Sequence, residues 1–429
     1  MTTTDSAPTP AKGSGLAFAY VTTLFFAWGF VTSLIGPLIA AVRRVFDLTY
    51  AEATLTTSAW FIAYGVASIP AAALLSRLGY SRSILLALVV MVFGCLIVPV
   101  ATMADWYPGV LIALFVIASG VTLLQVGANP LVAVLGPQKS SHLRLNFSQG
   151  FNALGTALAP RLIAPILLTG GVFAADAVIT PATRAESLRS IDFAFLIVAA
   201  ALALVAVFIF SARKSINAAA PEAGEGAVSP LKALKSKWAV LGALAIFFYV
   251  GSEVAIGDLM TNFLHSPHIL DIPLAEAGTM VSWYWTAAMI GRFVGVALLT
   301  RVRAPVLLMV CTAVAALLCL VVTQTTGSTA AYCAIAIGFF NSIMFPTIFT
   351  LTLERSSAPT SATSGLLIFG IIGGAILPLL AGQVADANPL LNPVFYVPLV
   401  GYLLLTGFAV AAGRAKVHSP VAVGSPGSH

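Results

Sequence analysis

Residues Gly120 to Gly155 read GVTLLQVGANPLVAVLGPQKSSHLRLNFSQGFNALG, and the fold of the whole chain can be approached from this stretch. It is apolar enough to hold parts of two membrane-spanning helices, yet it carries four amide side chains, at Gln125, Asn129, Gln149 and Asn152. A short basic loop with Lys139, His142 and Arg144 is expected to join the two helices. An amide inside a segment of hydrocarbon length is costly unless it faces a partner or a water-filled cavity. The stretch therefore predicts two helices that line an internal site.

The composition of the whole chain is that of a polytopic membrane protein. Hydrophobic residues make up 59% and charged residues 8%, and the mean hydropathy is +1.00, whereas a soluble domain carries about 25% charged residues. These long continuous apolar runs differ from the alternating segments of roughly ten residues that a transmembrane β-barrel shows. A helical span needs about 20 apolar residues. The sequence predicts an all-α membrane protein with twelve such spans, at 16–42, 52–76, 83–103, 108–136, 144–170, 191–212, 238–264, 275–299, 304–325, 329–353, 362–386 and 392–413.

The distribution of basic residues predicts that both termini lie in the cytoplasm. Under this orientation the cytoplasmic side holds the larger set: Lys12, Arg77, Arg82, Lys139, Arg144, Arg213, Lys214, Lys232, Lys235, Lys237, Arg301, Arg303, Arg355, Arg414 and Lys416. The outer loops hold only Arg43, Arg44, Arg184 and Arg189. Cytoplasmic loops of membrane proteins are enriched in Lys and Arg. The net charge of +6 is therefore a topology signal, and we expect a lipid bilayer but no nucleic acid as a partner.

A polar segment rich in Ala, Gly, Pro and charge divides the chain into two sets of six spans. We expect a cytoplasmic N-terminal tail at 1–15, a six-helix bundle at 16–211, a cytoplasmic linker at 212–237, a second six-helix bundle at 238–413 and a cytoplasmic C-terminal tail at 414–429. The halves echo one another, because basic turns follow the second span of each, with Arg77, Gly79 and Arg82 in the first half and Arg301 and Arg303 in the second. Two such bundles related by a pseudo-twofold axis are the architecture of major facilitator transporters.

Sequence motifs in both halves resemble one branch of these transporters. The first stretch contains Gly127-Ala128-Asn129-Pro130, Val134-Leu135-Gly136-Pro137, Arg144-Leu145-Asn146 and Gln149-Gly150-Phe151-Asn152. Further motifs are Phe25-Phe26-Ala27-Trp28-Gly29-Phe30, Tyr249 to Gly257, Asn341 to Thr347, Ser364-Gly365-Leu366-Leu367 and Gly373-Gly374. Together they resemble the fucose permease and glucose/galactose porter family, in order, over about residues 18–410. The resemblance implies secondary transport of a sugar by alternating access, with a cation driving uptake.

The departures from this family concern its titratable groups. The fucose permease carries carboxylates in span 1 and span 4, and the corresponding positions here are Gly36 and Gln125. Interior acids occur instead in span 7, at Glu253 and Asp258. An acid at the bilayer centre costs about 2.5–3.5 kcal/mol on insertion scales. Glu253 and Asp258 are therefore the candidates for cation coupling, by H⁺ or Na⁺, and no other cofactor is expected.

The candidate substrate-binding residues are those whose chemistry suits a sugar. Hydroxyl groups of a pyranose pair with amides, and its C–H face stacks on aromatic rings. The candidates are Gln125, Asn129, Gln149, Asn152, Glu253, Asn262, Trp283, Trp285 and Asn341. The alternatives are hydrogen bonds between helices for the amides and Glu253, interfacial anchors for Trp283 and Trp285, and an acid in the outer vestibule for Asp258. The loop motif and gating residues are predicted to be Arg77, Gly79, Arg82, Arg292 and Glu354. Arg292, near the cytoplasmic end of its span, is expected to snorkel or to pair with an acid such as Glu354.

These patterns predict a monomeric sugar transporter of a bacterial inner membrane. The expected substrate is a neutral hexose or an N-acetylhexosamine. The alternatives are a facilitative uniporter, an exporter of drugs or other small molecules, and a sensor that binds sugar without moving it. A sensor would be expected to carry a signalling domain, and an exporter a cavity with fewer amides. An enzyme is the weakest alternative, because the sequence offers neither a nucleophile with its base nor a metal-binding cluster.

Overall fold

The computed structural model describes residues 14–33, 38, 45–48, 50–167, 172, 180–220, 230–388 and 390–417, and every regular element in them is helical. The first half contains α1 (Ser14–Thr32), α3 (Tyr50–Met103), α4 (Tyr107–Val134), η1 (Gln138–Ser140), α5 (Ser141–Leu167) and α6 (Pro181–Ala219). The second half contains η3 (Pro230–Lys235), α7 (Lys237–His265), α8 (Leu274–Leu299), α9 (Ala304–Gln324), α10 (Gly327–Asn341), α11 (Met344–Leu353), α12 (Thr360–Phe369), η4 (Gly370–Ile372), α13 (Gly373–Asp386), η5 (Asn392–Phe395) and α14 (Tyr396–Arg414).

The described helices account for the twelve crossings predicted from the sequence. Among them, 9 helical stretches are long and apolar enough to cross a membrane. One of these, α3, crosses twice, because its backbone turns at Gly79, where φ is 74°. A positive φ is readily adopted only by glycine. Two further helices, α5 and α8, complete the set. They carry polar side chains of the region between the halves, Gln149 and Asn152 on α5 and Arg292 on α8.

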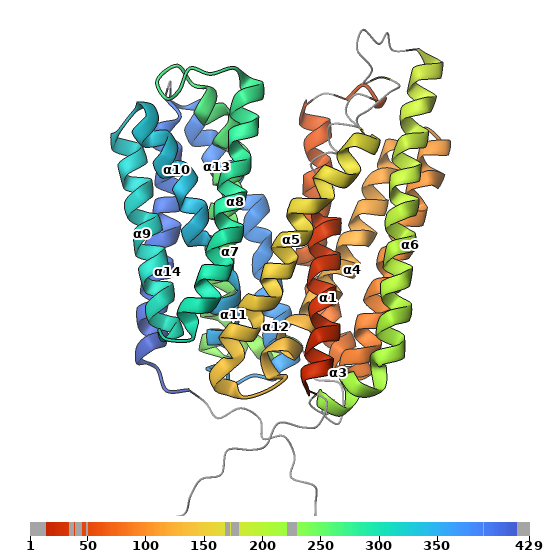
Figure 1. Cartoon of the computed structure of the whole chain (residues 1–429), viewed down its shortest axis with the longest axis vertical. Coiled ribbons are helices and arrows are strands. Elements are labelled where there is room, and N and C mark those ends of the chain that lie inside the picture. The colour runs from red at the N-terminus through yellow and green to blue at the C-terminus, as the bar shows by residue number, and fades with distance from the viewer. Residues whose placement is uncertain are drawn as a thin grey trace, which may run out of the picture.

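The two halves stand side by side and meet near one end (Figure 1). Helix α5 runs obliquely across this junction and contacts α8 and α11 of the second half, while α12 contacts α3 and α4 of the first. A Cβ atom at Gly150 in α5 would lie 3.1 Å from the ring of Phe293 in α8. The bare glycine therefore lets these two helices approach closely at the level of the amides.

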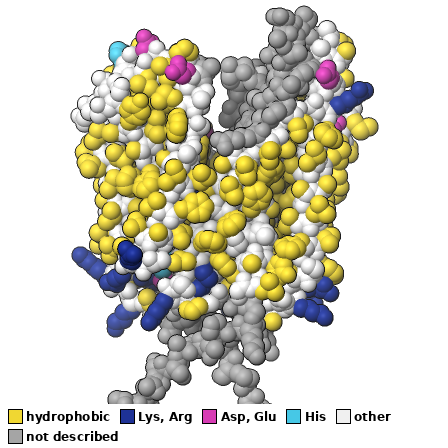
Figure 2. All heavy atoms as spheres, in the orientation of Figure 1, with side chains coloured by type: hydrophobic (Ala, Val, Ile, Leu, Met, Phe, Trp, Pro, Cys, Tyr) yellow, Lys and Arg dark blue, Asp and Glu magenta, His cyan; other side chains and the backbone are white. Residues whose placement is uncertain are grey.

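Charge divides the two ends of the molecule. Helix α1 begins and α14 ends at the end where dark blue side chains gather in Figure 2, and a broad apolar band separates it from the other end. We call it the basic end, and its exposed residues include Arg77, Arg82, Lys139, Lys214, Lys232, Lys235, Lys237, Arg301, Arg303, Arg414 and Lys416. The opposite end carries the exposed acids Asp105, Glu186, Asp271 and Glu276. The apolar band is what a lipid-facing surface requires.

Some of the sequence-based expectations lie outside the described residues. Gly36, which stands at the position of the family's first carboxylate, is one of these, as are Lys12, Arg43 and Arg44. Residues 221–229 of the predicted linker and 418–429 of the predicted C-terminal tail also fall outside the described part of the chain.

Candidate functional site

A contact between Gln149 and Arg292 joins the two halves in the interior of the molecule. Arg292 on α8 donates from Nη1 to the main-chain oxygen of Gln149 on α5 at 2.8 Å and to its side-chain Oε1 at 3.3 Å. Gln149 is buried and Arg292 is half-buried. Charge-assisted hydrogen bonds are about twice as strong as neutral ones. Arg292 therefore fixes the position of α5 relative to α8.

The polar contact continues from Gln149 into the first half. Gln149 Nε2 donates to Oδ1 of Asn129 on α4 at 3.5 Å. The Nδ2 group of Asn129 and the Nε group of Arg292 are buried and have no protein partner in the described part of the chain. Buried polar groups are nearly always hydrogen-bonded. Two unused donors on either side of Gln149 are therefore suited to a ligand that offers oxygen acceptors.

Glu253 lies beside this row on α7. Its Oε1 accepts a hydrogen bond from the hydroxyl of Tyr249 at 2.8 Å, and Arg292 is near enough for the two charges to interact. Tyr249, Glu253 and Gly257 follow one another at four-residue spacing, so they lie on one face of the helix. That face is directed toward α8, since a Cβ at Gly257 would lie 3.1 Å from the ring of Trp285. The structure thus brings Glu253, Arg292 and Gln149 into one polar row across the two halves.

Asp258 and Asn262 form a second polar pair on α7, separate from Glu253. Both are exposed, and their spacing of four positions places them on one face of the helix. Asp258 has no hydrogen-bond partner or ion pair among the described residues. Two acids one and a half turns apart on the same helix therefore have different surroundings.

The two tryptophans of α8 face different directions. Trp285 and Arg292 are seven positions apart, which places them within about 20° of each other around the helix. Trp283 is nine positions from Arg292 and lies about 180° from it. Trp285 is 44% exposed and Trp283 is 62% exposed. Trp285 consequently shares the face of α8 that reaches across to Gln149, about 10 Å farther from the basic end. Trp283 is on the face turned away from it.

The remaining amides make hydrogen bonds within one half. Gln125 Nε2 donates to the hydroxyl of Tyr64 at 2.9 Å, and Asn152 Nδ2 donates to the main-chain oxygen of Phe25 at 3.2 Å. In the second half, Asn341 Nδ2 donates to the hydroxyl of Tyr284 at 2.8 Å. Each bond holds two helices together beside the central row.

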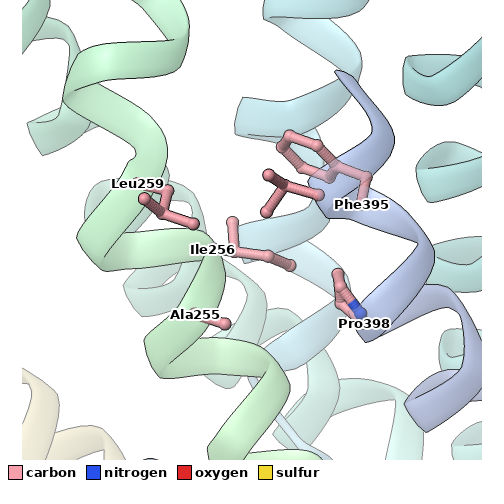
Figure 3. A pocket seen from close by; sticks show the side chains of 6 residues that line it. Ala255, Ile256, Leu259, Phe395 and Pro398 are labelled. Carbon is pink, nitrogen blue, oxygen red and sulfur yellow. The ribbon is translucent and has the colours of Figure 1, made fainter. Parts of the chain in front are cut away.

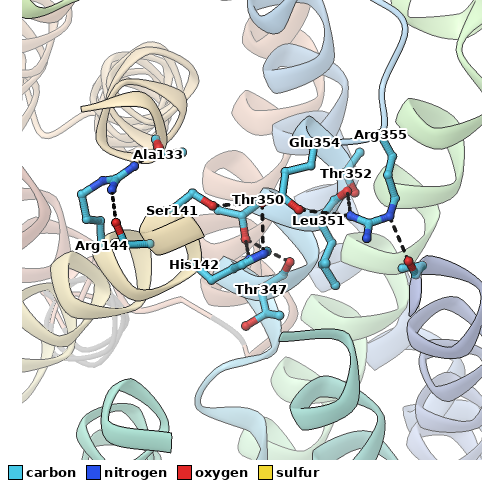
Figure 4. A network of polar contacts seen from close by, with 12 residues as sticks. Ala133, Ser141, His142, Arg144, Thr347, Thr350, Leu351, Thr352, Glu354 and Arg355 are labelled. Carbon is cyan, nitrogen blue, oxygen red and sulfur yellow. Dashed lines mark hydrogen bonds and ion pairs between the residues drawn. The ribbon is translucent and has the colours of Figure 1, made fainter. Parts of the chain in front are cut away.

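A second network joins the halves at the basic end (Figure 4). Nε2 of His142 on α5 lies 3.1 Å from Oε1 of Glu354, which follows α11. The hydroxyl of Ser141 donates to the same oxygen at 3.0 Å, and Nδ1 of His142 contacts the hydroxyl of Thr350. Arg355 Nη1 lies 3.2 Å from Oε2 of Glu354. We call these residues the His142–Glu354 cluster.

The environment of Glu354 keeps its carboxylate charged. Burial alone would raise its pKa, but hydrogen bonds from His142 and Ser141 and the charges of His142 and Arg355 outweigh burial, so the pKa of Glu354 lies below its ordinary value. A carboxylate that accepts several hydrogen bonds is stabilised in its charged form. The cluster therefore has a negative charge at its centre.

Two expectations about the basic residues are corrected by this arrangement. Arg292 was expected to snorkel or to pair with an acid such as Glu354, but it donates to Gln149, and Glu354 pairs with His142 and Arg355. His142 and Arg144 were expected in a loop, but both lie in the first turns of α5. Arg144 is buried, and its guanidinium donates to oxygens at the end of α4 and in the turn after it, including those of Val132 at 3.0 Å and Pro137 at 2.9 Å. The carbonyl of Val132 lies in the last turn of α4, where carbonyls have no partner within the helix. The carbonyl of Pro137 lies in the turn after α4 and also accepts from the main-chain N–H of Ser140.

The predicted loop motif lies at the same end. Gly79 makes the turn in α3, and Arg77 and Arg82 on either side of it are exposed. The sequence analysis did not predict the contact between His142 and Thr350 in the His142–Glu354 cluster. Their contact joins positions 208 residues apart in sequence, and such a separation leaves no local pattern to recognise.

A small apolar pocket is a separate feature. It lies between α7 and the start of α14 and is lined by Ala255, Ile256, Leu259, Val394, Phe395 and Pro398 (Figure 3). It has room for about one water molecule. A space of this size and chemistry cannot hold a sugar.

Comparisons with known proteins identify the class. The profile of the Major Facilitator Superfamily matches residues 21–378. A glucose/galactose transporter of Brucella abortus is 37% identical over 404 residues, which cover 94% of this chain and 96% of the relative. The L-fucose-proton symporter of Escherichia coli is 30% identical over 413 residues, covering 92% of each. The crystal structure of the transporter FucP in the outward conformation superposes with a TM-score of 0.83 at 27% identity, covering 94% of this chain and all of that one.

The chain belongs to the Major Facilitator Superfamily. Its relatives in this family are membrane transporters and not enzymes. The fold expected from the sequence, two six-helix bundles of the major facilitator type, is confirmed.

Proposed function

We propose that this protein is a secondary active transporter that takes up a neutral monosaccharide by alternating access. The observation that carries the proposal is the polar row Asn129–Gln149–Arg292, which spans the two halves and contains unused hydrogen-bond donors. The hydroxyl and ring oxygens of a hexose or an N-acetylhexosamine suit these donors. The relatives named for glucose, galactose and L-fucose transport support a sugar of this class.

The substrate would lie against the row with one apolar face on an aromatic ring. Trp285 is on the required face of α8, and Gln149 and Asn129 supply amides from the opposite half. Gln125, Asn152 and Asn341 stabilise the helices that carry this site through the bonds to Tyr64, Phe25 and Tyr284. Trp283, on the far face of α8, suits an anchor at the membrane interface.

The orientation follows from the charges. We place the basic end in the cytoplasm, because Lys and Arg concentrate on cytoplasmic loops. We also propose that the protein is a monomer in the inner membrane of a bacterial cell. In this orientation the His142–Glu354 cluster acts as a gate that closes the cytoplasmic side. The similarity to FucP in its outward conformation supports an outward-facing state.

Coupling to a cation requires a titratable or ion-binding group in the path. The first half offers Gln125 where the family has a carboxylate, so Asp258 and Glu253 on α7 are the groups we assign to it. Asp258 is exposed and has no hydrogen-bond partner or ion pair among the described residues, which suits an acid that takes up a proton from the outside. The L-fucose-proton symporter among the relatives supports H⁺ as the coupling ion; Na⁺ and uncoupled transport are the alternatives.

Uptake by the purified protein in proteoliposomes tests the proposal. A panel of glucose, galactose, fucose, N-acetylglucosamine and an amphiphilic dye is offered while pH and Na⁺ gradients are imposed separately. We expect saturable accumulation of one or more sugars that an inward pH gradient drives. Accumulation of the dye without any sugar would contradict the proposal, and equilibration of sugar without accumulation under either gradient would reassign the protein as a uniporter.

A further inference from the structure

A hydrogen bond between Ser364 and Val126 joins the two halves at a main-chain oxygen. The hydroxyl of Ser364 on α12 donates to the carbonyl oxygen of Val126 on α4 at 2.8 Å, and both residues are buried. Val126 lies in the part of α4 that leads to its end at Val134, and Ser364 lies in the second turn of α12 after its start at Thr360. Both positions are therefore toward the basic end, where the halves meet (Figure 1).

Pro130 explains why the oxygen of Val126 is available. In an α-helix the carbonyl of one residue accepts from the N–H of the residue four positions later. Four positions after Val126 stands Pro130, inside α4, and proline has no N–H. A buried carbonyl without a partner costs free energy. Ser364 therefore supplies, from the opposite half, the hydrogen bond that the proline removes from the helix.

The packing around this bond leaves little room for water to take the place of Ser364. At the next residue of α12, a Cβ on Gly365 would lie 2.5 Å from the Cβ of Ala72 and 3.1 Å from the main-chain oxygen of Ser68, both on α3. Helix α12 is thus held closely against the first half. If the halves separate at the basic end, α12 leaves α4, and water that enters between them can bond to the carbonyl instead.

Two other polar contacts between the halves have groups that keep a partner within their own half. Asn146 Nδ2 on α5 donates to Thr347 Oγ1 on α11 at 3.4 Å, but it also donates to the main-chain oxygen of His142 in its own helix at 2.9 Å. Glu354 keeps Arg355. The carbonyl of Val126 differs, because its regular donor within α4 does not exist.

We propose that Ser364 and the carbonyl of Val126 form a latch between the halves, which stabilises the arrangement that is closed at the basic end. Pro130 makes the latch effective, since it removes the competing bond within α4. Exchange of a hydroxyl partner for water shifts the balance of the two arrangements several-fold and does not lock either one. The inference rests on the proposed function only for the movement of the halves, and the latch is separate from the polar row Asn129–Gln149–Arg292.

Distances between the halves at the basic end test the latch without any substrate. Spin labels at Lys214→Cys on α6 and Arg301→Cys after α8 report the separation in lipid nanodiscs by double electron–electron resonance, with the partly exposed Cys311 and Cys333 replaced by alanine. Ser364→Ala removes the donor and leaves the carbonyl buried without it in the closed arrangement. We expect the ratio of closed to open molecules to fall about three- to tenfold.

Pro130→Ala tests the origin of this dependence on Ser364. Alanine restores an N–H that can donate to Val126 within α4, so the carbonyl keeps a partner in both arrangements. In this background, Ser364→Ala should change the ratio by less than about twofold. The comparison of Ser364→Ala in the two backgrounds is a double-mutant cycle, so an effect of Pro130→Ala alone on the bend of α4 cancels.

Thr363→Val is the matched control on α12. Thr363 is buried, and its hydroxyl bonds to that of Ser356 in the same half at 2.7 Å, so the ratio should stay at the wild-type value. An unchanged ratio in Ser364→Ala would overturn the inference, as would equal effects of Ser364→Ala in the two backgrounds or an equal effect of Thr363→Val. Because these measurements use no sugar, a failure of sugar uptake would contradict the proposed function and leave these ratios as they are.

Discussion

Arg292 uses a single nitrogen, Nη1, to hold both the main-chain oxygen and the side-chain Oε1 of Gln149, at 2.8 and 3.3 Å. The two residues belong to different halves, so this contact must break or rearrange if the halves separate on the cytoplasmic side. It also lies beside Glu253, whose charge attracts the same guanidinium. Gln149 therefore lies where a contact between the halves meets a charged pair, and the proposed substrate would lie against it.

Replacement of Arg292 by lysine should slow transport much more than it changes folding. Lysine keeps the positive charge but has a shorter reach, and its ammonium is a point charge without the planar fork of arginine. We expect the uptake rate to fall by about tenfold or more, on the basis of one lost charge-assisted contact. Initial rates of sugar uptake in proteoliposomes measure the effect. Normal rates in this variant would show that the cross-half contact has no part in the cycle.

Gln149→Ala should weaken sugar binding. The loss of one or two hydrogen bonds of about 0.5–1.5 kcal/mol each predicts a rise in Kd of roughly tenfold. Isothermal titration of the purified protein with its sugar measures this change. An unaltered Kd would remove Gln149 from direct contact with the substrate.

The matched control for Gln149 is another buried amide that lies far from the row. Asn392 Nδ2 donates to the oxygens of Val322 at 2.8 Å and Thr325 at 2.7 Å, at the end of α9. Asn392→Ala should lower stability by about 1–3 kcal/mol, because these bonds are lost and a carbonyl is left without a partner. Its Kd for sugar should stay the same, and a thermal unfolding curve should show the loss.

Much of the fold could be predicted because the length and polarity of each span can be read from its local sequence. The twelve spans, the turn at Gly79 and the amides of α4 and α5 are all local features of the sequence. The partners of Arg292 and Glu354 could not be predicted in this way. Helix spacing places a side chain on a face, but which of several acceptors it reaches depends on how two halves, joined only by a linker, are set against one another. In place of the Arg292–Glu354 pair that the sequence allowed, the structure has two separate contacts, Arg292 with Gln149 and Glu354 with His142, and each joins the two halves.

Asp258→Asn should uncouple transport from its driving ion. The amide cannot release a proton, while its size and its position on the exposed face of α7 are unchanged. We expect accumulation driven by a pH gradient to disappear, and exchange of labelled for unlabelled sugar to continue at close to the original rate. Glu276→Gln, which removes an exposed acid in the first turn of α8, should leave both activities intact. Accumulation driven by a pH gradient that survives in Asp258→Asn would transfer the coupling role to Glu253.

Trp285 and Trp283 provide a paired test of where the sugar lies. Trp285 shares a face of α8 with Arg292 and packs over Gly257, whereas Trp283 faces the other way. An aromatic pair or stacking contact is worth about 0.5–1.5 kcal/mol beyond the area it buries, so Trp285→Ala should raise the Kd several-fold, and Trp285→Phe should restore most of the affinity. Trp283→Ala should leave the Kd unchanged, because an anchor at the membrane interface does not contact the substrate. Quenching of tryptophan fluorescence on titration with sugar reports the same assignment directly: the signal should vanish in Trp285→Phe and persist in Trp283→Phe, and the reverse result would place the substrate on the other face of α8.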